Sequence, residues 1–116
     1  MRVIIAGSRN TELTSKEIYQ ELDKIYSKID ITKVLSGGAR GIDTYGEAWA
    51  ILNKIFVERY TADWNKYGKA AGPIRNRKMA ENADALIVFP GGSGTRSMIS
   101  EARKRNLTIF FVGVDF

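Results

Sequence analysis

Three segments, two of them dense in glycine, contain the residues of this sequence that are best suited to bind a ligand. They are Gly7-Ser8-Arg9, Ser36-Gly37-Gly38-Ala39-Arg40-Gly41 and Pro90-Gly91-Gly92-Ser93-Gly94-Thr95. Glycine lets backbone N–H groups approach a phosphate without a Cβ in the way, and a helix N-terminus after the loop adds positive partial charge. Arg9 and Arg40 add bidentate donors for a phosphate. The alternative interpretation is that these segments are only tight turns between strands and helices.

Four further residues are candidates for contacts with a sugar, a base or a phosphate. Asp43 falls in the first turn of a predicted helix, where it either interacts with the helix dipole or serves as a ribose-hydroxyl acceptor or general base. Trp64 has two interpretations: its ring either stacks on a base or packs a long loop against the rest of the protein. Arg75 and Asn76 open another predicted helix after Pro73, where a cation opposes the dipole unless an anion lies nearby.

The composition excludes several classes of chemistry. The 116 residues include no His and no Cys, which rules out Ser-His-Asp catalysis, His-based zinc sites, disulfides and a Cys nucleophile, so no metal site is expected. The net charge of +5 favours an anionic partner. The absence of Cys suits a reducing compartment, and the apolar runs are too short to span a bilayer. We therefore expect a cytoplasmic protein without a membrane partner. The sequence does not identify a cofactor.

The elements that must position these residues alternate between strands and helices. Apolar runs at residues 3–6, 33–35, 55–60, 85–89 and 108–112 predict five strands. Helices are predicted between them: one after a capping box of Thr14 and Glu17, one over residues 42–53 with Leu52 on its buried side, one from near Pro73, and one following Thr95. We expect one α/β domain over residues 1–116, a Rossmann-like, doubly wound, parallel five-stranded sheet with helices on both faces. Its ligand should bind beyond the carboxyl ends of the strands.

Several of these motifs resemble a known superfamily. The segment from Pro90 to Thr95 is similar to the P-G-G-x-G-T motif of the SLOG superfamily, which includes the Lonely Guy phosphoribohydrolases. The whole chain resembles the small YpsA-related SLOG proteins (the DUF2493 group) through Gly7-Ser8-Arg9, residues 37–43, 62–64 and 71–76, and the P-G-G loop. Residues 36–43 also resemble a stretch of DNA-processing protein A, a single-strand DNA binder. The resemblance implies a Rossmann-like fold, a role in binding or processing nucleotide-derived ligands, and a homo-oligomer.

The sequence departs from the phosphoribohydrolases at one position of their motif. That motif continues as P-G-G-x-G-T-x-x-E, and Met98 occupies the position of the glutamate. A thioether cannot act as acid, base or carbocation stabiliser. Glu101 lies one helical turn farther on, so Asp43 and Glu101 are the candidate catalytic residues, with Asp63 and Asp115 as other carboxylates near the carboxyl edge. The alternative for Glu101 is a surface ion pair with a nearby base.

Three functional hypotheses remain open from the sequence. The first is a protein that binds, and in one version hydrolyses, a nucleotide or nucleotide-derived ligand. The second is a single-strand nucleic-acid binder, because residues 64–78 interleave five Lys and Arg residues with two aromatic residues and contain no acidic residue. The third is a carrier that sequesters a small nucleotide signal or phosphorylated cofactor. The predicted ligand-binding residues are Gly7, Ser8, Arg9, Ser36, Gly37, Gly38, Arg40, Gly41, Asp43, Trp64, Arg75, Asn76, Pro90, Gly91, Gly92, Ser93, Gly94 and Thr95.

Overall fold

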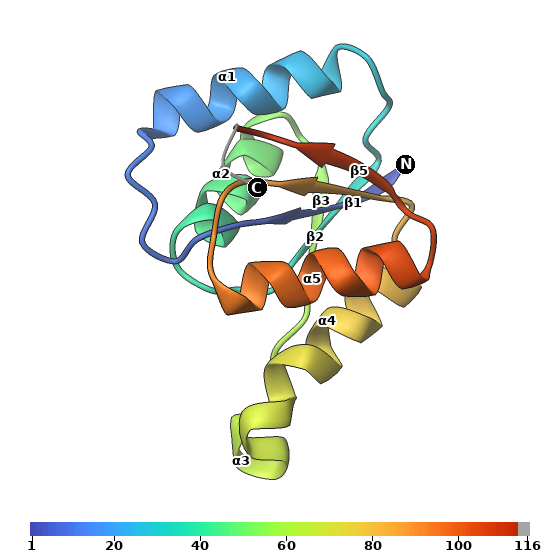
Figure 1. Cartoon of the computed structure of the whole chain (residues 1–116). Coiled ribbons are helices and arrows are strands. Elements are labelled where there is room, and N and C mark those ends of the chain that lie inside the picture. The colour runs from blue at the N-terminus through green and yellow to red at the C-terminus, as the bar shows by residue number, and fades with distance from the viewer. Residues whose placement is uncertain (114–116) are drawn as a thin grey trace.

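A parallel five-stranded sheet forms the centre of the computed structural model, which describes residues 1–113 (Figure 1). The strands are β1 (Arg2–Ala6), β2 (Lys33–Ser36), β3 (Phe56–Arg59), β4 (Ala85–Val88) and β5 (Thr108–Phe111). Their order in the sheet is β3-β2-β1-β4-β5, and every neighbouring pair is parallel. This is the doubly wound order that the alternating pattern predicts. Asp115 lies outside the described residues.

The helices cover both faces of this sheet, as expected for the fold class. They are α1 (Ser15–Tyr26), α2 (Ile42–Leu52), α3 (Trp64–Tyr67), η1 (Gly68–Ala70), α4 (Ala71–Glu81) and α5 (Ser93–Lys104). The cores show which helix covers which face, because Val3 and Ile5 pack in one cluster with residues of α1 and α2. Ile4 and Ala6 pack in a second cluster with residues of α4 and α5. Alternate β1 side chains therefore serve opposite layers, as the period of a strand requires.

Two helix starts lie earlier in the chain than the sequence predicts. α5 begins at Ser93 inside the glycine-rich loop and not after Thr95, because Gly92 takes the N-cap position. α4 begins at Ala71, so Pro73 lies in its first turn, where proline fits well. The short helix α3 was not predicted, and Asp63 starts it by accepting a hydrogen bond from the Lys66 N–H at 3.1 Å. Figure 1 shows α3 projecting beyond α4, away from the sheet.

The N-terminus of α1 confirms the predicted capping box. The Thr14 hydroxyl accepts a hydrogen bond from the Glu17 N–H at 3.1 Å, and the Glu17 carboxylate accepts one from the Thr14 N–H at 3.0 Å. These hydrogen bonds satisfy N–H groups that a helix start otherwise leaves free. The chain therefore carries its own signal for the start of α1.

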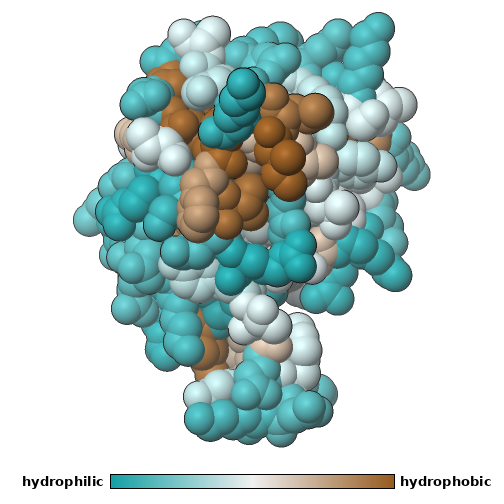
Figure 2. Space-filling view, turned by 180° about the vertical axis from the view of Figure 1, so that it is seen from behind, coloured by the Kyte–Doolittle hydropathy of each residue, from teal (hydrophilic) through white to brown (hydrophobic). Residues whose placement is uncertain are grey.

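The expectation that Leu52 lies on the buried side of its helix is wrong. Leu52 is 70% exposed, together with Ile51 at 69% and Phe56 at 64%, because α2 ends at Leu52 and the chain there turns back toward edge strand β3. Figure 2 shows an apolar patch on the face of the molecule that carries these elements. Within residues 1–113, no helix has the length and apolar composition needed to cross a bilayer.

Candidate functional site

A cavity of about 580 Å³ opens at the carboxyl edge of the sheet. Its walls come from the loops that follow β1, β2 and β4, from the start of α5, and from α4. β1 and β4 are neighbours in the sheet although β2 and β3 lie between them in the chain, so the strand order reverses at this point. Doubly wound sheets bind ligands at such a switch point. The volume is in the usual range for small-ligand sites, roughly 300–1,000 Å³.

The start of α5 presents backbone N–H groups to this cavity. Gly92, Ser93, Gly94 and Thr95 all line it, and no side chain caps the helix. A Cβ added at Gly92 or Gly94 would meet no atom within 4 Å. The first N–H groups of a helix have no intrahelical acceptor and carry positive partial charge. An anion can therefore reach the backbone here without steric hindrance.

Other glycines of the predicted site have a different role, because they let loops cross at close range. Gly41 has φ 78°, and a Cβ there would overlap the Ser8 carbonyl oxygen. A Cβ at Gly91 would overlap the Thr95 hydroxyl, and one at Gly7 would lie 2.7 Å from the Ile42 side chain. These glycines hold the three loops together at the sheet edge. These glycines shape the walls of the cavity, and their own backbone is packed against neighbouring residues.

Arg75 and Asn76 connect α4 to two of the loops. The Arg75 Nη1 donates to the Gly37 carbonyl at 2.7 Å, and its Nε donates to Asn76 Oδ1 at 3.0 Å. Asn76, which is 5% exposed, donates from Nδ2 to Ser97 Oγ at 3.2 Å on α5. Burial lowers the pKa of Arg75, and the Asp43 carboxyl opposes this shift. A guanidinium nevertheless stays charged in proteins, so Arg75 is a fixed cation in the cavity wall.

Asp43 is the carboxylate of the cavity. Among residues 1–113, no other acidic residue lines it. Burial raises the pKa of Asp43 to about 6, although the Ala39 N–H donates to Asp43 Oδ2 at 3.2 Å and the charge of Arg75 lies nearby. Its proton is therefore gained and lost close to neutral pH. Asp43 can accept from or donate to a hydroxyl of a ligand there.

The mouth of the cavity adds two cations and an aromatic ring. Arg9 and Lys69 line it and are exposed. Trp64 also lines it, at 51% exposure, and its ring lies over Gly72, where an added Cβ would be 3.3 Å from Trp64 Cη2. The cations of the lining outnumber its single carboxyl group, which favours an anionic ligand.

The β2 loop is held by contacts that lead away from the cavity. The Gly38 N–H donates to Ser36 Oγ at 3.1 Å, and the Ser36 hydroxyl donates to Glu47 Oε2 at 2.5 Å. Arg59 Nε donates to the same Glu47 oxygen at 3.1 Å. Burial opposes ionisation of Glu47, but the hydrogen bonds from Arg59 and Ser36 outweigh it and lower the pKa of that carboxyl. This network fixes the loop that supplies Gly37 and leads into α2, where Asp43 lies in the first turn.

The cavity brings together most of the residues predicted from the sequence, and others lie beside it. The residues that line it are Gly7, Ser8, Arg9, Gly37, Asp43, Trp64, Arg75, Asn76, Gly92, Ser93, Gly94 and Thr95. Those outside its lining are Ser36, Gly38, Arg40, Gly41, Pro90, Gly91 and Glu101. The lining residues that were not predicted as ligand contacts are Ile5, Ala6, Asn10, Ala39, Lys69, Gly72, Pro73, Met79, Ser97 and Met98. Ser97 lies one helical turn after Ser93, so helical spacing was the available signal for it.

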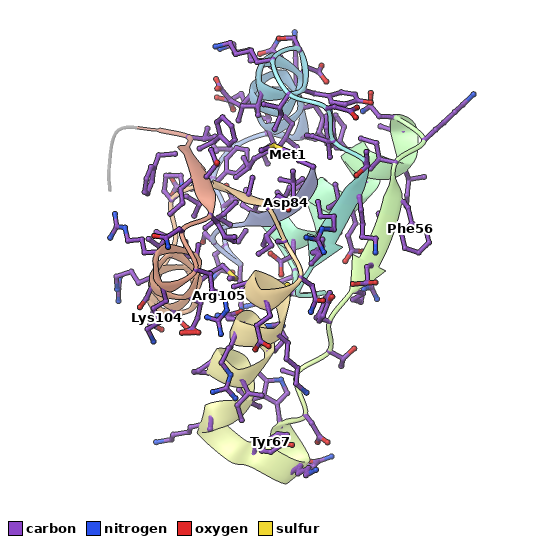
Figure 3. All side chains as sticks on the ribbon, turned by 90° about the vertical axis from the view of Figure 1, so that its right-hand side faces the viewer. Met1, Phe56, Tyr67, Asp84, Lys104 and Arg105 are labelled. Carbon is purple, nitrogen blue, oxygen red and sulfur yellow. The ribbon has the colours of Figure 1, made fainter. Side chains whose placement is uncertain are left out.

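Met98, at the motif's glutamate position, and Glu101, one helical turn farther on, have distinct surroundings. Met98 is 1% exposed and lines the cavity, so a thioether stands where the phosphoribohydrolase motif has its carboxylate. Glu101 pairs with Lys104 at 3.0 Å and with Arg105 at 3.2 Å. Figure 3 labels Lys104, the last residue of α5, and Arg105, which follows it. Within the described part of the chain, no three Asp or Glu side chains gather closely enough to hold a metal ion.

Comparisons with known proteins agree with this architecture. The model of the YspA, cpYpsA-related SLOG family matches residues 1–67. The Gene 61 protein of Mycobacterium phage D29 is 32% identical over 120 residues, which cover 97% of this chain and 96% of that protein.

Two solved structures share the fold. DNA processing protein A of Streptococcus pneumoniae superimposes with a TM-score of 0.76 at 19% identity, over 99% of this chain. This chain spans about half of that protein, 51% of its length. DNA processing protein A of Helicobacter pylori, whose structure was described for its single-stranded DNA binding mode, gives a TM-score of 0.74 at 21% identity, over 100% of this chain and 66% of that one. From the family match and the phage relative together, the chain belongs to the YspA, cpYpsA-related SLOG family.

Proposed function

We propose that the cavity binds the phosphate of a nucleotide or nucleotide-derived ligand. The observation that carries this proposal is the start of α5, where Gly92 and Gly94 face open space and no side chain caps the helix. A phosphate there accepts hydrogen bonds from the backbone N–H groups, and the helix dipole stabilises its negative charge. Arg9 and Arg75 lie in the same cavity and supply the countercharge. The cavity has room for a nucleoside in addition to the phosphate.

The other parts of the ligand have candidate partners in the lining. Asp43 is the hydrogen-bonding group for a ribose hydroxyl, because it is the one carboxyl group that the described residues bring into the cavity. Trp64 is half exposed at the mouth, where its ring is available to stack on a base. This assignment places phosphate at α5, sugar near α2 and base near α3.

We favour binding over hydrolysis of an N-glycosidic bond. That reaction develops positive charge on the sugar and needs a carboxylate beside the anomeric carbon. Met98 occupies the motif position, and Glu101 is paired with Lys104 and Arg105 outside the cavity lining. Asp43 remains as the candidate acid or base. Release of free base from a nucleoside monophosphate by the wild type, lost in Asp43→Asn, would show that the site is catalytic.

The test of the binding proposal is a thermal-shift screen followed by a substitution at Gly92. Wild type should be stabilised by a nucleoside monophosphate, by about 2.7 kcal/mol at about 100 times its Kd. Gly92→Val should abolish that stabilisation and keep the fold, since the added atoms enter the open space that the phosphate needs. Ser100→Val is the matched control, because Ser100 is an exposed residue of the same helix outside the cavity lining. Unchanged binding by Gly92→Val would refute the proposal.

A further inference from the structure

A second, smaller cavity lies beside the first and has no role in the function proposed above. Its volume is about 260 Å³, and its lining includes Arg59, Tyr60, Tyr67, Arg75 and Lys78. This volume is below the roughly 300–1,000 Å³ that small-molecule sites usually need. The second cavity is thus too small to hold a nucleotide by itself, but it is large enough to hold part of a larger ligand.

Arg75 joins the two cavities, because its side chain lines both of them. A guanidinium has five N–H donors. Arg75 uses one for the Gly37 carbonyl and one for Asn76, which leaves three for a ligand. A ligand that extends from the first cavity into the second would pass this fixed cation.

The charges of the second cavity also favour an anion. Among residues 1–113 its lining has three cations and one carboxylate, that of Asp63. The Arg59 guanidinium is already paired with Glu47. Lys78 is exposed, and within residues 1–113 no carboxylate pairs with its ammonium group. Lys78 and Arg75 are therefore the cations that remain available to a phosphate.

Tyr67 adds an aromatic surface to this cavity. It is 38% exposed on α3, and Figure 3 shows it on the projection that α3 forms beyond α4. Lys66 Nζ lies 5.1 Å from the centroid of its ring. An aromatic ring next to cations is the combination with which proteins hold a base and the phosphate beside it.

We infer that the second cavity is a subsite for the second phosphate of the same ligand, so that the ligand class is two or more nucleotides joined by a phosphodiester. This inference rests on the proposed function, since the first nucleotide occupies the larger cavity. Arg75 contacts the ligand between the two subsites, Lys78 binds the second phosphate, and Tyr67 contacts the second base. A free dinucleotide and the end of a single strand offer the same chemistry to these residues.

The experiment compares 5′-deoxyadenylate with its phosphodiester-linked dimer and tetramer by isothermal titration calorimetry. Wild type should bind the dimer about tenfold more tightly than the monomer, since one charge-assisted contact changes Kd by about that factor. Lys78→Ala should remove this gain and leave the Kd of the monomer unchanged. Arg77→Ala is the matched control, because Arg77 is the preceding residue of α4, pairs with Glu81 and lines neither cavity.

The outcomes separate this inference from the proposed function. Equal affinity for monomer and dimer, or equal effects of Lys78→Ala and Arg77→Ala, would overturn the second subsite while the phosphate site at α5 stands. Binding that is unaffected by Gly92→Val would overturn the proposed function and this inference with it. A further gain from dimer to tetramer identifies a single strand as the source of the second phosphate, and a plateau at the dimer identifies a small dinucleotide.

Discussion

The loops that follow β2 and β4 have nearly the same glycine content and opposite environments. In the β2 loop the Gly38 N–H donates to Ser36, the Ala39 N–H donates to Asp43, and Gly41 lies against the backbone of Ser8. These backbone donors are already used inside the protein. The β2 loop thus acts as part of the frame of the site.

In the β4 loop only the first of the three glycines is packed in this way. Gly91 lies against Thr95, whereas Gly92 and Gly94 have no atom near the position of a Cβ. No side chain caps the helix that starts there. Glycine therefore serves two purposes at one sheet edge: it lets backbones cross at close range, and it leaves a helix start open to a ligand. Substitutions that add a Cβ should distinguish the two purposes.

The largest effect is expected for Gly41→Ala. Alanine at φ 78° and ψ −131° adopts a backbone conformation that L-residues avoid, and its Cβ would overlap the Ser8 carbonyl oxygen. We expect a loss of about 3 kcal/mol or more in the free energy of unfolding. Urea denaturation measures it, and Gly92→Ala is the control that should unfold at nearly the wild-type midpoint. Equal midpoints for the two variants would remove the distinction between packed and open glycines.

The next largest effect is expected on the pH dependence of stability, through Asp43, which follows the β2 loop. Burial raises the pKa of Asp43 from 3.8 to about 6, so the folded state binds the proton more tightly than the unfolded state does. The stability that this group contributes is present below about pH 4 and is lost as the pH rises through about 6. Asp43→Asn should flatten that decline and raise the stability at pH 7 by up to about 3 kcal/mol.

A control of opposite sign is available at Asp84, which Figure 3 labels at the start of β4. Hydrogen bonds from Arg2 lower the pKa of Asp84 to about 2. The stability that Asp84 contributes is present above its pKa in the unfolded state, 3.8, and is lost as the pH falls through about 2. Asp84→Asn should therefore lower stability at pH 7. Denaturation midpoints of both variants between pH 2 and 8 test the pair, and a wild-type slope between pH 4 and 6 retained in Asp43→Asn would contradict the buried role of Asp43.

The smallest effect is expected for Gly94→Ala, where stability and binding should change in opposite directions. Gly94 lies in α5 with space for a Cβ, and alanine in a helix is favoured over glycine by about 0.5–1 kcal/mol. The variant should be more stable by up to that amount and should bind a nucleoside monophosphate less tightly. Thermal denaturation and calorimetry measure the two quantities. If Gly94→Ala bound the nucleoside monophosphate more tightly than wild type does, the phosphate would not lie at the start of α5.

The fold could be predicted from the sequence because its signals are local. Residues 3–6 and 85–89 are continuous apolar runs, and the Thr14–Glu17 capping box lies within four residues of chain. The exposure of Leu52 was not predicted, because it depends on where α2 ends relative to the sheet. The helix start at Ser93 was missed since glycine at an N-cap leaves no side-chain signal.

The site could be predicted less fully than the fold because its contacts join distant parts of the chain. The hydrogen bond from Arg75 to the Gly37 carbonyl spans 38 residues, and the pKa of Asp43 depends on burial that no local pattern reports. The sequence gives no means of distinguishing Gly41 from Gly92, since only φ and the neighbouring atoms separate them. The homo-oligomer and the cytoplasmic location stay predictions, and sedimentation velocity over a range of concentrations tests the first.

The most direct test of the difference between the two loops is an amide ¹H–¹⁵N NMR titration with a nucleoside monophosphate and, separately, with the nucleoside. The N–H signals of Gly92, Ser93 and Gly94 should shift most with the monophosphate and little with the nucleoside, because the phosphate contacts the open start of α5. The signals of Gly38 and Ala39 should move less, because their N–H groups already donate to Ser36 and Asp43. Largest shifts at Gly38 and Ala39, with those of Gly92 and Gly94 unchanged at saturation, would contradict the account.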